Sequence, residues 1–196
     1  ICSLCVGVCP NMALLTYESE PFTAALPVLR VEDGQVVSGE RRAYRAEQGL
    51  QIAVQTDFCN ECGNCVTACP TSGEPYRDKP RLYLDRAEFE AEADNAFMLL
   101  QDGSIAGRFG GQTHRLSMNG AVTYEAPSLS ARLEHSSLEL LDAESGVDAE
   151  AGAISLEPAA TMYVLARGLE GSMKHLPRAS TDGGVGTRVR PPDHRG

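Results

Sequence analysis

The sequence feature that most constrains this chain is a group of four closely spaced cysteines, Cys59, Cys62, Cys65 and Cys69, followed directly by Pro70. They read C-x2-C-x2-C-x3-C-P. In bacterial-type ferredoxins this spacing lets three thiolates bind one [4Fe–4S] cluster, while the fourth thiolate binds a second cluster. The pattern therefore predicts an iron–sulfur domain with two clusters.

A second, shorter group lies at the first residues of the chain, where Cys2, Cys5 and Cys9 precede Pro10 and only a leading cysteine is missing. If the last cysteine of each group binds the cluster of the other group, so that the ligands cross over, one cluster is held by Cys2, Cys5, Cys69 and an upstream residue. The other cluster is then held by Cys59, Cys62, Cys65 and Cys9, so all seven cysteines are used. Because that upstream cysteine and an initiator Met are both absent, we expect this sequence to be the C-terminal piece of a longer protein.

Two other uses of paired cysteines stay open at this point. Cys-x-x-Cys pairs also build structural zinc sites, and they pair in disulfides in extracellular chains. Zinc sites use two separated pairs and stop at four ligands, whereas this chain repeats the x3 gap and the trailing proline. No nearby side chain is suited to act as a general base or nucleophile, so we predict electron transfer and no catalytic residue in this chain.

Charge and hydropathy exclude several classes of partner. The formal net charge of −10 over 196 residues argues against binding to nucleic acid or to an anionic membrane. No stretch approaches the roughly 18 apolar residues of a membrane span. Reduced thiolate ligands favour the cytoplasm.

Between the two cysteine groups the pattern predicts strands. Apolar residues on both sides of Glu32-Asp33-Gly34-Gln35 predict a hairpin over 27–37, and partial alternation predicts a strand from Leu50 to Phe58 that leads into Cys59. The charged segment from Gly39 to Gln48 is expected to be a solvated loop.

After Pro70 the chain alternates loop and short elements. We expect a short strand over 81–84, a helix over 86–93 capped by Asp85, and antiparallel strands over 97–156, where Asp102-Gly103 and Asn119-Gly120 mark hairpins. A helix from Pro158 to about Leu169 would place Met162, Leu165 and Leu169 in the core. His114, His135, His175 and His194 are expected at the surface or in capping roles.

These elements predict an α+β fold. It would contain a two-cluster ferredoxin-like domain over 1–84 with an enlarged β insertion between the cysteine groups. A β-rich module with a C-terminal helix would follow over 85–172, and a disordered tail rich in Gly, Pro and Arg over 173–196.

The residues around the cysteines resemble those of a known family. The segments 5–13 (Cys-Val-Gly-Val-Cys-Pro-Asn-Met-Ala) and 58–65 (Phe-Cys-Asn-Glu-Cys-Gly-Asn-Cys), with Gly73, Pro75-Tyr76 and Asp78-Lys79 beyond them, resemble the C-terminal ferredoxin region of the putative selenate reductase subunit family. The resemblance covers roughly residues 2–105. It assigns the seven cysteines as cluster ligands.

That family is similar to the glutamate synthase small subunit, so the resemblance implies FAD- and NAD(P)H-binding domains upstream of Ile1. It also implies a partner redox subunit, such as a molybdenum enzyme, that receives the electrons. Two alternatives remain beside this hypothesis: a stand-alone or complex-bound ferredoxin-type carrier, and a zinc-stabilised structural module whose β-rich part binds a partner.

Overall fold

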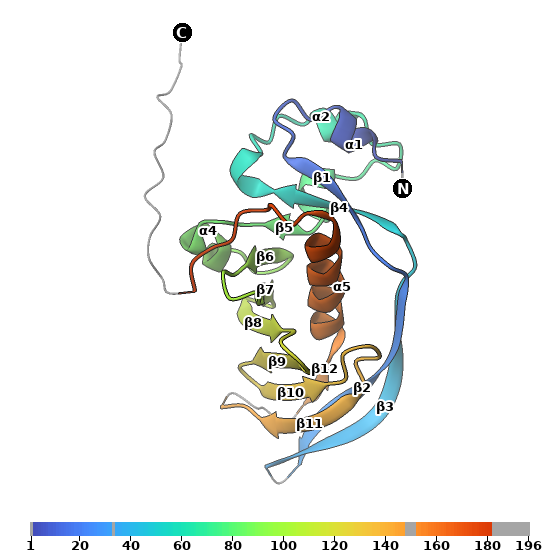
Figure 1. The fold of residues 1–196 in the computed structure, drawn as a ribbon, viewed down its shortest axis with the longest axis vertical. Helices are drawn as coiled ribbons and strands as arrows, with labels where there is room; N and C mark the ends of the chain where they lie inside the picture. The colour runs from blue at the N-terminus through green and yellow to red at the C-terminus, as the bar shows by residue number, and fades with distance from the viewer. Residues whose placement is uncertain (1, 33, 148–151, 182–196) are drawn as a thin grey trace.

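The computed structural model describes residues 2–32, 34–147 and 152–181, and within them the fold is of the α+β class, as predicted. Helices are few and the strands dominate (Figure 1). In chain order the elements are α1 Leu4–Gly7, β1 Leu14–Glu18, β2 Phe22–Glu32, β3 Gln35–Ala46, β4 Leu50–Gln55, a 3-10 helix Thr56–Phe58, α2 Asn64–Thr67, α3 Pro75–Asp78, β5 Arg81–Leu82, α4 Arg86–Ala91, β6 Ala96–Leu99, β7 Ile105–Phe109, β8 Gln112–Ser117, β9 Val122–Ala126, β10 Leu129–Leu133, β11 Leu140–Ser145, β12 Ala153–Ser155 and α5 Glu157–Ser172.

The larger sheet has nine strands in the order β1-β4-β5-β6-β7-β8-β9-β10-β11. Strand β5 pairs in parallel with both β4 and β6, and every other pair is antiparallel. The predicted hairpins lie at Asp102-Gly103 and Asn119-Gly120, where both glycines have positive φ. The predicted division at residue 84 falls inside this sheet, between β5 and β6, and it stays a prediction.

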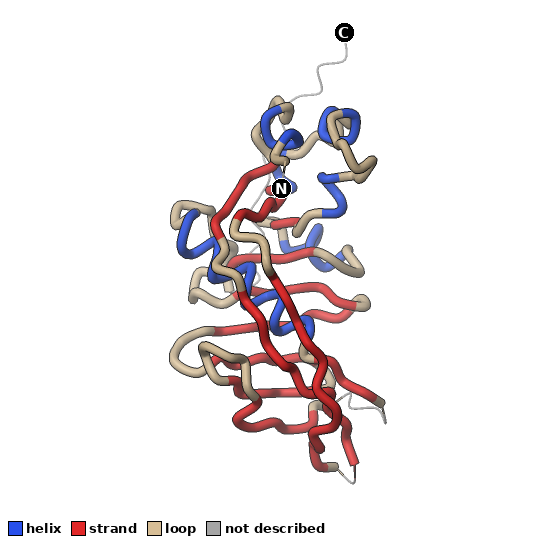
Figure 2. Tube along the Cα trace, turned by 90° about the vertical axis from the view of Figure 1, so that its right-hand side faces the viewer, coloured by secondary structure: helices blue, strands red, loops and turns tan. Residues whose placement is uncertain are grey.

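The insertion between the cysteine groups forms a long hairpin, β2 and β3, which β12 extends to a three-stranded sheet. The hairpin runs from the cysteine end of the molecule to β11 at the opposite end (Figures 1 and 2). The expectation of a loop over 39–48 was wrong for residues 39–46, because β3 continues to Ala46 and pairs with β2. Its charged side chains are exposed, so a solvated strand face was mistaken for a solvated loop.

Helix α5 lies between the two sheets (Figures 1 and 2) and contacts β1, β7 and β8 on one side and β3 on the other. Met162, Leu165 and Leu169 are buried, as predicted. Tyr163 and Val164 are buried as well, because the hairpin covers the side of the helix that the larger sheet leaves open. The helix is therefore a central core element.

Two further expectations can be compared with the structure. Residues 182–196 of the expected tail, with His194, lie outside the described residues, whereas Ala179 bridges to Leu100, and Leu176 packs against the core. The expectation of a surface position was wrong for His114, which is buried in β8 with its Nδ1 2.5 Å from the Tyr124 hydroxyl.

The packing of α5 on β1 leads to a stability prediction. A Cβ added at Gly168 would lie 2.5 Å from the Tyr17 ring and 2.9 Å from the Glu18 carbonyl oxygen, whereas a Cβ at Gly171 would meet nothing within 4 Å. We expect Gly168→Ala to lower the free energy of unfolding by about 1–3 kcal/mol through overpacking. Gly171→Ala, the matched control in the same helix, should be neutral or slightly stabilising. Urea unfolding of both variants tests this, and equal midpoints would contradict the packing described.

Candidate iron–sulfur site

Strand pairing brings the two cysteine groups together. Strand β1 begins just after the first group and β4 ends just before the second, and Leu14 pairs with Val54 in an antiparallel register. The predicted strand into Cys59 is confirmed over 50–55, and the 3-10 helix completes the approach. Cysteines far apart in the sequence therefore meet at one edge of the larger sheet.

The two cysteine loops repeat each other with an offset of 60 residues. Each begins with a residue in the left-handed region, Ser3 (φ 52°) and Gly63 (φ 80°), which opens a single helical turn, α1 or α2. Each turn buries one cysteine, Cys5 and Cys65, both 6% exposed. The helices α1 and α2 contact each other, so the two halves of the repeat lie side by side.

The repeat continues through the Cys-Pro turns. The backbone N–H of Ala13 donates to Cys9 Sγ at 3.3 Å, and that of Gly73 donates to Cys69 Sγ at the same distance. Each donor follows a residue with positive φ, Met12 or Ser72, which turns the N–H back toward the sulfur. Such donors stabilise a negatively charged sulfur.

Four of the predicted ligands line one small hollow: Cys9 from the first loop and Cys59, Cys62 and Cys65 from the second. The hollow is also lined by Leu14, Gly63, Asn64 and Tyr76. This is the combination that crossing the ligands over predicts. Four thiols around one small cavity fit the thiolate donor set of a [4Fe–4S] cluster.

The other three cysteines come from both loops, Cys2 and Cys5 from the first and Cys69 from the second. Cys5 is buried with Cys2 beside it, and Cys69 is half-buried at the end of the second loop. All seven cysteines are described, and all are free thiols. Within the described ranges, no three His, Cys, Asp or Glu side chains are grouped to bind a single metal ion. The assignment of individual ligands stays a prediction.

The electrostatic surroundings of the thiols differ. Burial raises the pKa of Cys5 and of Cys59. The pKa of Cys69 is lowered, first by the Thr71 hydroxyl and then by the backbone N–H groups of Gly73 and Thr71. Burial therefore disfavours the thiolate forms of Cys5 and Cys59, whereas Cys69 lies among donors that favour its thiolate.

The chain after the second loop is anchored by polar contacts that sequence reasoning missed. The Asn95 side chain donates to the carbonyl oxygens of Arg77 (2.8 Å) and Lys79 (2.9 Å). Arg81 donates two hydrogen bonds to Glu92, at 2.9 and 2.8 Å, and the Tyr83 hydroxyl donates a third at 2.7 Å. These contacts fix the segment that returns from Cys69 to β5.

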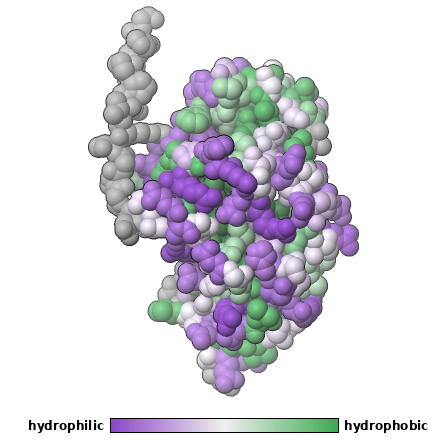
Figure 3. Space-filling model, in the orientation of Figure 1, coloured by the Kyte–Doolittle hydropathy of each residue, from purple (hydrophilic) through white to green (hydrophobic). Residues whose placement is uncertain are grey.

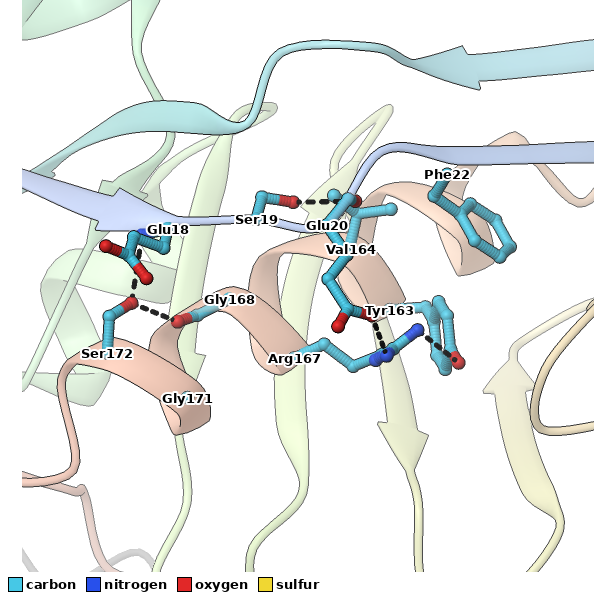
Figure 4. Close-up of a pocket in the computed structure, with 10 residues that line it drawn as sticks. All are labelled: Glu18, Ser19, Glu20, Phe22, Tyr163, Val164, Arg167, Gly168, Gly171 and Ser172. Carbon is cyan, nitrogen blue, oxygen red and sulfur yellow. Dashed lines mark hydrogen bonds and ion pairs between the residues drawn. The ribbon is translucent and has the colours of Figure 1, made fainter.

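A separate hollow of about 310 Å³ lies between the β1–β2 turn and α5 (Figure 4). No cysteine lines it, and its polar groups pair with one another: Arg167 with Glu20, and the Ser172 hydroxyl with the Glu18 N–H and the Gly168 carbonyl. Of these two hollows, the smaller one at the cysteines is the one that thiols line.

The surface around the cysteine loops is partly apolar. Leu4, Val8, Met12 and Phe58 are all exposed, and Figure 3 shows apolar side chains at the end of the molecule that carries α1 and α2. Among the described residues, no helix combines the length and hydropathy that a membrane crossing requires.

Comparison with known proteins agrees with this geometry. Residues 1–70 match the family described as 4Fe-4S dicluster domain. With the cysteine loops, this match supports a ferredoxin-type iron–sulfur domain in that part of the chain.

The chain is also similar to the protein named "Putative oxidoreductase YgfK" of Escherichia coli, in strain K12 and in O157:H7. Each is 27% identical over 119 residues, which are 61% of this chain and 9% of the relative. The chain thus spans about a tenth of the length of these curated relatives. No solved structure matches it.

The Arg81–Glu92 pair leads to a pH prediction. The two hydrogen bonds from Arg81 hold the pKa of the Glu92 carboxyl below its usual range. Because the folded-state pKa is depressed, the pair stabilises the fold above the unfolded pKa of about 4.3. That contribution is lost as the pH falls through the folded-state value.

We expect Glu92→Gln to lower the free energy of unfolding by about 1 kcal/mol at pH 7. The difference from the unmodified protein should shrink below pH 4. Glu90→Gln is the control, because Glu90 is exposed and lies 3.8 Å from Arg86. Urea unfolding at pH 7 and at pH 3 measures both, and a difference that stays constant with pH would contradict the assignment.

Proposed function

We propose that this chain is the iron–sulfur electron-transfer segment of a larger flavin- and NAD(P)H-dependent oxidoreductase, similar to the putative selenate reductase subunit family. It would relay electrons through two [4Fe–4S] clusters. The observation that carries the proposal is the hollow in which Cys9 of the first loop meets Cys59, Cys62 and Cys65 of the second. A ligand shared between two motifs is the arrangement of two-cluster ferredoxins.

In this proposal the second cluster is held by Cys2, Cys5, Cys69 and a thiolate that precedes Ile1. The repeat with an offset of 60 residues supports it, because each loop places its last cysteine in the same turn. When bound, such clusters supply reversible one-electron transfer, and four thiolates leave no open position for a substrate.

The chain's own residues would prepare this site in two ways. Leu14, Ile52 and Val54 are buried beside the cysteines and exclude water from one side of the site. The backbone N–H groups of Ala13 and Gly73 stabilise negative charge on the last cysteine of each loop. These residues hold the ligands and adjust the local potential, and they perform no proton transfer.

The rest of the proposed protein lies outside this chain. The relatives are about ten times longer than the matched region, which supports a larger protein. We place FAD- and NAD(P)H-binding domains before Ile1 and a partner redox subunit, such as a molybdenum enzyme, as the electron acceptor. The exposed apolar side chains beside the cysteine loops suit a surface covered by another part of that assembly. Thiolate ligands favour the cytoplasm, and no substrate is assigned.

Iron analysis of paired variants tests the shared ligand. In the intact protein, purified and reconstituted without oxygen, we expect about eight irons per chain and a visible absorption band that dithionite bleaches. Cys9→Ser combined with Cys62→Ser removes two ligands of one cluster, so about four irons should remain. Cys9→Ser combined with Cys69→Ser removes one ligand from each cluster, and both should be weakened.

Val8→Ser is the control, because Val8 is exposed and adjoins Cys9 without being a ligand; it should leave the iron content unchanged. If the two double variants lose iron equally, the crossed-over assignment is wrong. If the protein is colourless and contains zinc under iron-replete conditions, the electron-relay hypothesis is wrong and the alternative of a zinc-stabilised structural module replaces it.

A further inference from the structure

The two cysteine loops are matched in most of their contacts and differ in one. Both last cysteines accept a backbone N–H at 3.3 Å, from Ala13 to Cys9 and from Gly73 to Cys69. Only Cys69 has a side-chain partner as well, the Thr71 hydroxyl, whose Oγ1 lies 3.3 Å from Cys69 Sγ. The equivalent residue in the first loop is Asn11, and among the described residues it makes no such bond to Cys9.

The direction of this hydrogen bond follows from the chemistry of the sulfur. Either atom can donate while Cys69 is a thiol. A thiolate bound to iron carries no proton, so the Thr71 hydroxyl must then be the donor. A hydroxyl that donates to the sulfur stabilises additional negative charge there, and a one-electron reduction adds such charge.

The position of Thr71 is held by the contacts around it. The Cys69 carbonyl oxygen accepts the Ser72 N–H at 3.2 Å, which closes the turn that contains Thr71. The Asp78 carboxylate accepts the Glu74 N–H at 2.7 Å, and a Cβ at Gly73 would approach Asp78 Oδ2 at 2.9 Å, so the loop has little room to shift. These contacts hold the backbone of the turn that carries Thr71.

We propose that the Thr71 hydroxyl makes the two clusters unequal, so that the cluster ligated by Cys69 is the more easily reduced. This inference rests on the proposed function and deepens it, because it names the cluster on which an electron accumulates. Thr71 is a positioning residue: its hydroxyl stabilises negative charge on the Cys69 sulfur and binds no iron itself.

The test is an EPR-monitored redox titration of the intact, anaerobically reconstituted protein. Dithionite supplies one electron per cluster and is itself oxidised. We expect Thr71→Val to lower the higher of the two midpoint potentials, changing the oxidised-to-reduced ratio at a fixed potential about tenfold, which is 59 mV for one electron. Thr71→Ser keeps the hydroxyl and should restore the original value. The converse variant, Asn11→Thr, should raise the lower midpoint.

Iron analysis of each sample separates this inference from the function on which it depends. If Thr71→Val binds two clusters and both midpoint potentials are unchanged, the inference is overturned and the proposed relay stands. The same conclusion follows if only the lower midpoint potential of Thr71→Val shifts. If Thr71→Val loses a cluster, the Asn11→Thr variant provides the test. An unchanged lower midpoint potential in Asn11→Thr then overturns the inference. Protein that binds no iron would overturn both.

Discussion

The structure depends on the pairing of β1 with β4. Ligands that are far apart in a chain must close a long loop before they can share a site, and loop closure costs conformational entropy. Here the antiparallel register of Leu14 with Val54 closes the loop with backbone hydrogen bonds and a buried apolar contact, both side chains being at most 3% exposed. The residues between them are folded into the β2–β3 hairpin, so the two cysteine loops face each other over an ordered base.

Local patterns predicted the parts of the fold that depend on neighbouring residues. The hairpin turns, the Asp85 cap and the core face of α5 follow from turn chemistry, capping and periodicity, and the structure confirms them. The Asp85 carboxylate accepts the Glu88 N–H at 2.9 Å, although α4 ends two residues earlier than expected, at Ala91. These features depend on neighbouring residues and can be predicted without knowing which distant residues they contact.

What sequence reasoning missed depends on distant partners. Strand β12 joins β2 from more than a hundred residues away, and β5 links the cysteine end of the sheet to the later strands through only two residues. At the site, cysteine spacing indicated the donor type, because ligand geometry imposes spacing on the sequence. No comparable sequence pattern marks Thr71, Asn95 or the Arg81–Glu92 pair, because their roles depend on tertiary contacts.

The parallel pairing of β4 with β5 gives the second cysteine loop a second role. Parallel strands require a crossover connection, commonly a helix, and between these strands that connection is the loop from the 3-10 helix to α3. Its two ends are tied where the Thr56 hydroxyl donates to the Leu82 carbonyl oxygen at 2.7 Å. The iron ligation proposed for this loop would therefore be thermodynamically linked to the sheet, since binding to the folded connection alone shifts the folding equilibrium of the strands it joins.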